Sequence, residues 1–220
     1  MSNGCDKLHK LFNLMERFIF PFDEKKIHSN GIYILFEKGE CAHGADRIVR
    51  IGTHTGLDQL RSRLKQHFIN ENKDRSIFRK NIGRAILNKN KDPFLKQWEW
   101  DLTTREAKST LGKKVCYQRQ KEIEKNVTKY IQKNLSFIII PIEKKEERLS
   151  LESKIISTVS LCKECGSSVK WLGLHSTKNK IRESGLWLVN ELYKEPLEEK
   201  EFIALKNHAW LAIKSNEQVK

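Results

Sequence analysis

The sequence predicts an α+β protein with a small antiparallel sheet of three strands flanked by helices. Two short apolar runs, GIYILF (31–36) and RIVRIG (47–52), follow one another closely and are typical of a β-hairpin. A third run, LSFIIIPI (135–142), is continuously apolar up to its proline and suits a buried strand. Around these runs, apolar residues recur every three or four positions, as in amphipathic helices. This order of segments predicts mixed α and β structure around one sheet.

The first half of the chain predicts three helices beside the hairpin. Residues 7–20 form the first, because their apolar residues have helical spacing, and Pro21 stops it. The polar segment EKGECAHGAD (37–46) is expected to be a long loop between the two strands. A helix covers residues 53–68, and another begins after Ser76, which is a favourable helix N-cap. The buried residues expected on these two helices are Leu57, Leu60, Leu64, Phe68, Ile77, Phe78, Ile82 and Ile86.

The second half continues the pattern and suggests three parts. Residues 105–133 form a charged helical stretch, residues 146–161 form a helix after the third strand, and a loop follows at 162–168. The last helix runs through Phe202, Leu205, Trp210 and Ile213. We expect an N-terminal helical extension (1–29), a core (30–175) with a basic helical insertion at about 93–133, and a C-terminal helical cap (176–220).

The charge of the chain predicts a polyanionic partner. The formal net charge is +14, and between residues 47 and 96 there are thirteen Lys and Arg residues but only four acids. Such clusters follow phosphate backbones, because Lys and Arg replace the counterions condensed on nucleic acids. The alternatives are a protein that charge merely keeps soluble, or one attracted to an anionic membrane surface.

The sequence also predicts a cytoplasmic protein with no membrane partner. No apolar run approaches the roughly 20 residues that a membrane span requires. The N-terminus lacks the basic region, apolar run and cleavage site of a signal peptide. Five cysteines, an odd number, suit reduced thiols in a cytosol.

Arg63 and His67 are the first candidates for chemistry. They are four residues apart on a predicted helix, so both side chains point to one side, next to the buried seam. A guanidinium suits a phosphate whose charge grows in a transition state. The histidine could orient or activate water, or contact a leaving-group oxygen. The alternative is an exposed helix face without a chemical role.

The two strands of the hairpin add Tyr33 and Arg50. Successive strand residues point to opposite faces, so only one of Ile32 and Tyr33 is expected to be fully buried. The tyrosine alone is compatible with simple packing. Arg50 lies within an apolar run, and we expect it to be functional or paired.

Glu152 is an acid in the middle of an apolar helix face. Its neighbours on that face are Leu149, Ile155, Ile156 and Val159. A buried, unpaired carboxylate is costly, and a metal ion or a cationic partner would resolve the conflict. The alternative is the first turn of a frayed helix, where an acid complements the helix dipole.

Cys162 and Cys165 have the C-x2-C spacing of half a zinc site. His175 is a candidate third ligand, but the spacing identifies no fourth. The sequence therefore favours reduced thiols over bound zinc.

Taken together, these strings resemble the GIY-YIG endonuclease family. GIY is present at 31–33, and the second motif appears as RIG at 50–52. The segment LRSRLKQH (60–67) is similar to the restriction-enzyme branch, in which an arginine and a histidine four residues later flank the scissile phosphate. Arg50 replaces the second tyrosine of the family, and Ser168 is a candidate replacement for its late asparagine. The resemblance covers about residues 30–175.

The resemblance implies a metal-dependent DNA endonuclease. Tyr33 would act as the general base or position the attacking water, Arg63 would hold the phosphate, and His67 would assist. Glu152 matches the family's glutamate and would bind Mg²⁺ or Mn²⁺. The expected DNA contacts, from the basic segments around the site, are Arg50, His54, Arg79, Lys80 and Arg84.

The likeness to the restriction-enzyme branch implies a role in restriction or another form of genome defence. Double-stranded DNA is the expected partner. A homodimer would suit double-strand cutting of a palindrome, and a restriction system would include a cognate methyltransferase. Two alternatives remain: a nucleic-acid-binding module that has lost cleavage, which Arg50 favours, and a structure-selective nuclease of repair or recombination.

Overall fold

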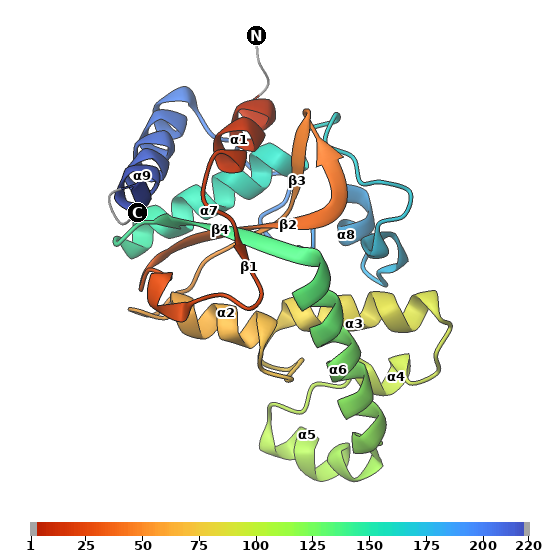
Figure 1. Ribbon diagram of the computed structural model, residues 1–220. Helices are drawn as coiled ribbons and strands as arrows, with labels where there is room; N and C mark the ends of the chain where they lie inside the picture. The colour runs from red at the N-terminus through yellow and green to blue at the C-terminus, as the bar shows by residue number, and fades with distance from the viewer. Residues whose placement is uncertain (1–3, 218–220) are drawn as a thin grey trace.

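A four-stranded antiparallel sheet forms the centre of the protein, in the strand order β1-β4-β2-β3 (Figure 1). The computed structural model describes residues 4–217, with side chains described as far as residue 213. The strands are β1 (Phe18–Ile19), β2 (Gly31–Ala42), β3 (Ala45–Gly52) and β4 (Leu135–Pro141). The predicted α+β class is confirmed, whereas the prediction of three strands is wrong.

The additional strand, β1, comes from residues predicted to lie in the first helix. That helix, α1, spans Gly4–Asn13 and ends well before Pro21. Phe18 pairs with Phe137 of β4, and the two rings stack with their centroids 5.3 Å apart. Packing of Phe18 against the sheet therefore outweighs the helical spacing of the surrounding apolar residues.

The β2–β3 hairpin is longer than predicted, and the expected loop over 37–46 is absent. A two-residue turn at His43 and Gly44 joins the strands, with φ values of 53° and 72°. Two successive positive φ values define a type I′ turn, whose twist matches that of the adjoining strands. The loop prediction fails because the acids Glu37 and Glu40 are buried against partners from other elements instead of being solvated.

Helices cover both faces of the sheet (Figure 1). On one face α1 packs with α7 (Lys145–Ser160) and α9 (Glu199–Glu217). On the other face lie α2 (Leu60–Phe68), α3 (Ile77–Lys89) and α6 (Tyr117–Asn134). Ile32 belongs to the first buried cluster and Tyr33 to the second, and both are 0% exposed. The expectation that only one of them is fully buried is therefore wrong.

The predicted burial on α2 and α3 is correct at Leu60, Leu64, Phe68, Phe78 and Ile82, whereas Ile86 is only partly buried. Ser76 caps α3 by accepting a hydrogen bond from the backbone N–H of Arg79. Leu57, which precedes α2, is 77% exposed, and Ile77, the first residue of α3, is 45% exposed. Apolar spacing alone does not locate where a helix leaves the core.

The remaining helices are α4 (Leu95–Trp98), α5 (Arg105–Thr110) and α8 (Asn179–Ser184), with 3₁₀ turns η1 (Glu24–Lys26), η2 (Gly112–Lys114) and η3 (Leu172–His175). In Figure 1, α4 and α5 lie away from the sheet, and α6 returns the chain to β4. The division into parts at 1–29, 30–175 and 176–220 stays a prediction, and residues 1–3 and 218–220 lie outside the described residues. No described helix has the length and apolar content to cross a membrane.

Candidate active site

Tyr33 lies in the middle of the sheet, where Gly52 makes room for its side chain and Gly31 allows β2 to approach β4 closely. In the strand register Tyr33 lies between Gly52 of β3 and Ile139 of β4. A Cβ atom at Gly52 would lie 2.2 Å from the Tyr33 hydroxyl oxygen. A Cβ atom at Gly31 would lie 2.6 Å from the carbonyl oxygen of Ile140. Both glycines of the GIY and RIG strings are therefore required by close packing.

A chain of hydrogen bonds links Tyr33 to α2 and to the start of α3. The Tyr33 hydroxyl oxygen is 2.8 Å from Nε2 of His67, and Nδ1 of His67 is 2.8 Å from Oγ of Ser76. All three side chains are buried. Burial, and secondarily three neighbouring arginines, lower the pKa of His67 well below its usual value. A neutral imidazole has one donor and one acceptor nitrogen, so it can hold the Tyr33 hydroxyl and exchange a proton with it.

Arg63 lies on α2, one turn before His67, and lines a pocket of about 270 Å³. Its Nη1 donates to Oε1 of Gln66 at 3.2 Å and to the carbonyl oxygen of Arg75 at 3.4 Å. The other guanidinium nitrogens make no hydrogen bond within the described part of the chain, which leaves donors for a phosphate. The rest of the pocket is formed by Thr53, His54, Thr55, Gln59, Ser62 and Gln66.

Glu152 approaches the same region from α7. Its Oε1 accepts a hydrogen bond from the backbone N–H of Thr53, 3.0 Å away, directly after β3. Burial raises the pKa of Glu152, and the positive charges of Arg50 and Arg63 oppose this shift. Glu152 lies in the middle of α7, so the alternative of a frayed first turn is wrong.

Arg50 is anchored inside the site. It is 5% exposed, its Nη1 donates to the carbonyl oxygen of Trp187 at 2.5 Å, and its guanidinium lies 4.9 Å from the centroid of the Phe78 ring. Its Nε is buried and has no hydrogen-bond partner among the described residues. The charge of Arg50 acts on both Glu152 and His67. We therefore interpret Arg50 as a fixed positive charge of the site, in agreement with the expectation that it is functional or paired, and its contact with DNA stays a prediction.

His54 lines the pocket next to Arg63. Its Nδ1 is 2.7 Å from the carbonyl oxygen of Gly56, which places the ring proton on Nδ1. Its Nε2 is buried and has no partner in the described chain. Burial lowers the pKa of His54. A neutral His54 can accept a hydrogen bond from water or a substrate hydroxyl, but it offers no charge to a phosphate.

Arg79, which the sequence suggested as a DNA contact, is bound inside the protein. It is 0% exposed, and its Nη2 lies 2.7 Å from Oε2 of Glu124 on α6. It also donates to the carbonyl oxygen of His67 at 3.0 Å and to Oγ1 of Thr128 at 2.8 Å. Its guanidinium thus joins α2, α3 and α6, and burial keeps it from a phosphate backbone.

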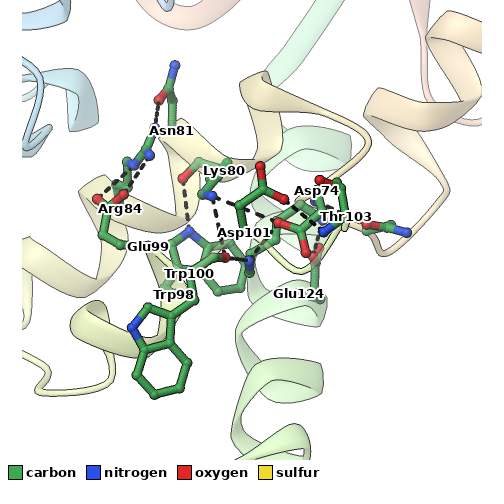
Figure 2. A network of polar contacts seen from close by, with 12 residues as sticks. Asp74, Lys80, Asn81, Arg84, Trp98, Glu99, Trp100, Asp101, Thr103 and Glu124 are labelled. Atoms are coloured by element: carbon green, nitrogen blue, oxygen red, sulfur yellow. Dashed lines mark hydrogen bonds and ion pairs between the residues drawn. The ribbon is translucent and has the colours of Figure 1, made fainter. Parts of the chain in front are cut away.

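Lys80 and Arg84 are likewise held by partners within the protein, as Figure 2 shows. Arg84 donates to both carboxylate oxygens of Glu99, at 2.8 and 2.6 Å. Lys80 is 7% exposed, and its Nζ lies 3.5 Å from the carbonyl oxygen of Trp100 and 3.8 Å from Asp74. The internal partners of Arg79, Lys80 and Arg84 weigh against DNA contacts at these residues, and their role in DNA binding stays a prediction.

The carboxylate oxygens of Glu152 are suitable ligands for a hard divalent cation. Mg²⁺ is commonly held by one or two carboxylates, with water and substrate phosphates supplying the remaining oxygens. Oε2 of Glu152 makes no hydrogen bond within the described residues, whereas Oε1 is held by Thr53. A cation at this position would therefore depend on water and substrate for most of its coordination.

Cys165 takes part in a cluster that the sequence did not predict. Its thiol lies close to Cys5, His9 and His43, whereas the predicted ligand His175 is exposed and outside this group. The prediction of His175 as a partner of Cys165 is therefore wrong. The sequence feature that could have indicated this cluster is the spacing of Cys5 and His9, which are four residues apart on an amphipathic helix.

A small antiparallel sheet with a buried tyrosine–histidine pair, next to an arginine and a carboxylate, is the arrangement of a phosphodiester-cleaving domain. The chain belongs to the GIY-YIG family, because a family model described as a GIY-YIG domain matches residues 6–211. A GIY-YIG domain implies nuclease activity with DNA as the substrate, and GIY-YIG nucleases generally use divalent metal ions. The match extends beyond residues 30–175 and includes most of α1 and most of α9. Neither curated proteins nor solved structures include a significant match.

Proposed function

We propose that this protein is a metal-dependent DNA endonuclease of a restriction or other genome-defence system, with Tyr33, Arg63, His67 and Glu152 as its catalytic residues. The proposal is supported by the 2.8 Å contact between Tyr33 and His67, and by the hydrogen bond from Thr53, which lines the same pocket as Arg63, to Glu152. The positive charge of Arg50 also acts on two of these residues, His67 and Glu152.

The chemistry of hydrolysis assigns a role to each side chain. A water oxygen forms a bond to phosphorus while the bond to the leaving-group oxygen breaks. Tyr33, held by the neutral His67, positions this water or takes its proton, and His67 can relay that proton. Arg63 donates to the phosphate oxygens, on which negative charge grows in the transition state. Glu152 would hold Mg²⁺ or Mn²⁺, which supplies Lewis-acid stabilisation when bound.

Cleavage of plasmid and genomic DNA tests the proposal. The wild-type protein should give discrete fragments with Mg²⁺ or Mn²⁺ and none with a chelator. Glu152→Gln and Arg63→Ala should each reduce the rate at least about a hundredfold, as expected for loss of a group that stabilises the transition state. Glu146→Gln, which changes an exposed acid on the same helix, should cleave like the wild type. Cleavage that survives Glu152→Gln would refute the assigned site.

The second candidate, a module that binds DNA without cutting it, is favoured by two observations. The Tyr33 side chain is 0% exposed, so water can reach its hydroxyl only if the site opens. Arg50, in the place of the second tyrosine, is bound to the Trp187 carbonyl. Tight binding of DNA with no cleavage in either metal would establish this candidate and exclude the first.

The same preparations test the finer parts of the proposal. A restriction enzyme should leave DNA methylated by a cognate methyltransferase intact, whereas a structure-selective repair nuclease should cut branched DNA and spare linear duplexes. A homodimer in solution, measured by light scattering, would fit simultaneous cutting of both strands. The expected cytoplasmic location follows from this role and is tested by cell fractionation.

A further inference from the structure

Five thiols and imidazoles from three distant segments meet at one end of the molecule. Cys5 and His9 lie on α1, His43 is in the β2–β3 turn, and Cys162 and Cys165 follow α7 (Figure 1). Cys5 and His9 are 0% exposed, Cys165 is 4% exposed, and the His43 side chain is 5% exposed.

Two sulfur–nitrogen pairs in this cluster lie at the distance expected of two ligands on one metal ion, and four of its five residues, without Cys162, form one compact group. Sγ of Cys162 is 3.5 Å from Nε2 of His43, and Sγ of Cys165 is 3.5 Å from Nε2 of His9. Cys165 and burial, and to a smaller extent Cys162, raise the pKa of the Cys5 thiol. Ligand atoms of Cys5, His9, His43 and Cys165 all lie within 4.8 Å of one another. A tetrahedral zinc ion with Zn–S near 2.3 Å and Zn–N near 2.0 Å places sulfur and nitrogen ligands about 3.5 Å apart.

The two imidazoles differ in the partners they already have. In His9, Nδ1 is 2.9 Å from the carbonyl oxygen of Cys5, and Nε2 accepts from the backbone N–H of Ile48 at 3.2 Å. Both of its nitrogens therefore have backbone partners. In His43, Nε2 is directed at the Cys162 thiol, and Nδ1 lies 3.8 Å from a carboxylate oxygen of Glu164. A carboxylate behind the second nitrogen is the usual support of a metal-bound histidine.

We propose that Cys5, Cys162, Cys165 and His43 bind a structural zinc ion, with His9 packed beside them as a structural neighbour. Three thiolates and one imidazole form a known structural zinc set, and soft sulfur ligands exclude Mg²⁺ as the preferred ion. The cysteines of the described chain form no disulfide, so their sulfur atoms are in the reduced state that zinc binding requires.

The zinc site is separate from the candidate active site. Ten residues of α7 and the following turn separate Glu152 from Cys162, a distance of about 15 Å along a helix. His43 and Gly52 mark the two ends of the hairpin, about 25 Å apart along β3. The proposal therefore does not rest on the proposed function. The ion would join the N-terminal helix to the sheet and to the end of α7, and its binding energy would add to the stability of the fold.

Metal analysis of the full chain tests the proposal. Protein expressed with added zinc and then desalted should contain one zinc per chain. Cys165→Ser and His43→Asn should each lose the metal, and Glu164→Gln should weaken zinc binding about tenfold. His9→Gln, and Cys116→Ser at an exposed cysteine outside the cluster, should keep it. A wild-type protein without bound zinc would overturn the proposal, and loss from His9→Gln with retention in Cys162→Ser would overturn the ligand set.

Measurements on the wild-type protein test the zinc site without relying on ligand variants, which could fail to fold. A chelator should lower the melting temperature, and zinc but not magnesium should restore it. Cobalt substituted at the site should show thiolate-to-metal charge-transfer absorption. A melting temperature that the chelator leaves unchanged, or cobalt spectra without this absorption, would also overturn the proposal. Both readouts are unchanged if the protein does not cleave DNA.

Discussion

The buried pair of Arg79 and Glu124 supports a quantitative prediction that decides between a structural and a DNA-binding role for Arg79. Arg79 donates from Nε and Nη2 to Oε2 of Glu124 at 3.1 and 2.7 Å, and Oε1 of Glu124 accepts from the backbone N–H of Lys73 at 2.5 Å. Removing one partner leaves the other charge buried without compensation, which costs about 3–5 kcal/mol. Glu124→Gln and Arg79→Met should therefore each destabilise the protein by about that amount.

Replacement of both partners should be much less harmful. The double variant Arg79→Met, Glu124→Leu leaves no isolated charge. Its loss in free energy of unfolding should therefore be smaller than the sum of the two single-variant losses by more than about 1 kcal/mol. Urea unfolding measures the free energies. In thermal unfolding the single losses correspond to about 6–20 °C for a chain of this size.

Salt-dependent DNA binding provides the contrasting readout. If Arg79 is structural, the double variant should show the wild-type slope of log K against log salt concentration. If Arg79 contacts a phosphate, its removal should reduce that slope by about one. A stability loss below about 1 kcal/mol in Arg79→Met, together with a reduced slope, would refute the structural interpretation.

Three further predictions concern the sheet and its polar partners. Gly52→Ala should cost about 1–3 kcal/mol, because the new Cβ would lie 2.2 Å from the Tyr33 hydroxyl, and urea unfolding measures the loss. Ser76→Ala should cost about 1–3 kcal/mol, because it removes both the α3 cap and the partner of His67, whereas Ser76→Thr should retain most of the stability. Glu37 has a pKa that burial raises, so the folded state binds more protons than the unfolded state between the two values. Wild-type stability should therefore fall as pH rises from about 4.5 through the raised pKa, and Glu37→Gln should flatten this fall when unfolding is measured across pH.

Matched variants control these experiments. Gly166→Ala adds a Cβ with no neighbour within 4 Å, so its stability should equal that of the wild type. If Gly52→Ala were equally well tolerated, the Tyr33 side chain would not pack against Gly52 as described. Glu16→Gln changes an exposed acid and should leave the pH dependence intact. Parallel pH profiles for Glu37→Gln and the wild type would contradict the assignment of Glu37.

Much of the fold could be predicted because its signals are local. The strands at 31–36, 47–52 and 135–142 and the helix at 146–161 all have apolar patterns longer than a turn, and the structure places elements at each of them. β1 could not be predicted, since two residues carry no pattern and their pairing with β4 is decided by a ring contact 119 residues away. The turn at His43 and Gly44 was missed because the strongest sequence signals for a type I′ hairpin turn are Asn-Gly and Asp-Gly, whereas this chain has His-Gly.

The same difference between local patterns and long-range contacts decides which parts of the candidate site could be predicted. Glu152 and the Arg63–His67 pair could be found because each conflicts with, or borders, a local apolar pattern. The burial of Arg79 could not, because its partner Glu124 is 45 residues away in the sequence. The cluster around Cys165 depends on pairs such as Cys165 and His9, 156 residues apart. Contacts of this length leave no trace in the spacing of a single sequence.

The tight packing of Gly31 and Gly52 has a consequence for how such chains are recognised. Each glycine admits a neighbouring atom that a methyl group would displace, whether or not the protein cleaves anything. A descendant that lost its nuclease chemistry would still need both glycines to assemble its sheet. The glycines of the GIY and RIG strings are thus explained by the packing of β2 against β3 and β4, not by catalysis. A change that inactivates such a protein should therefore appear first at Tyr33, Arg63 or Glu152.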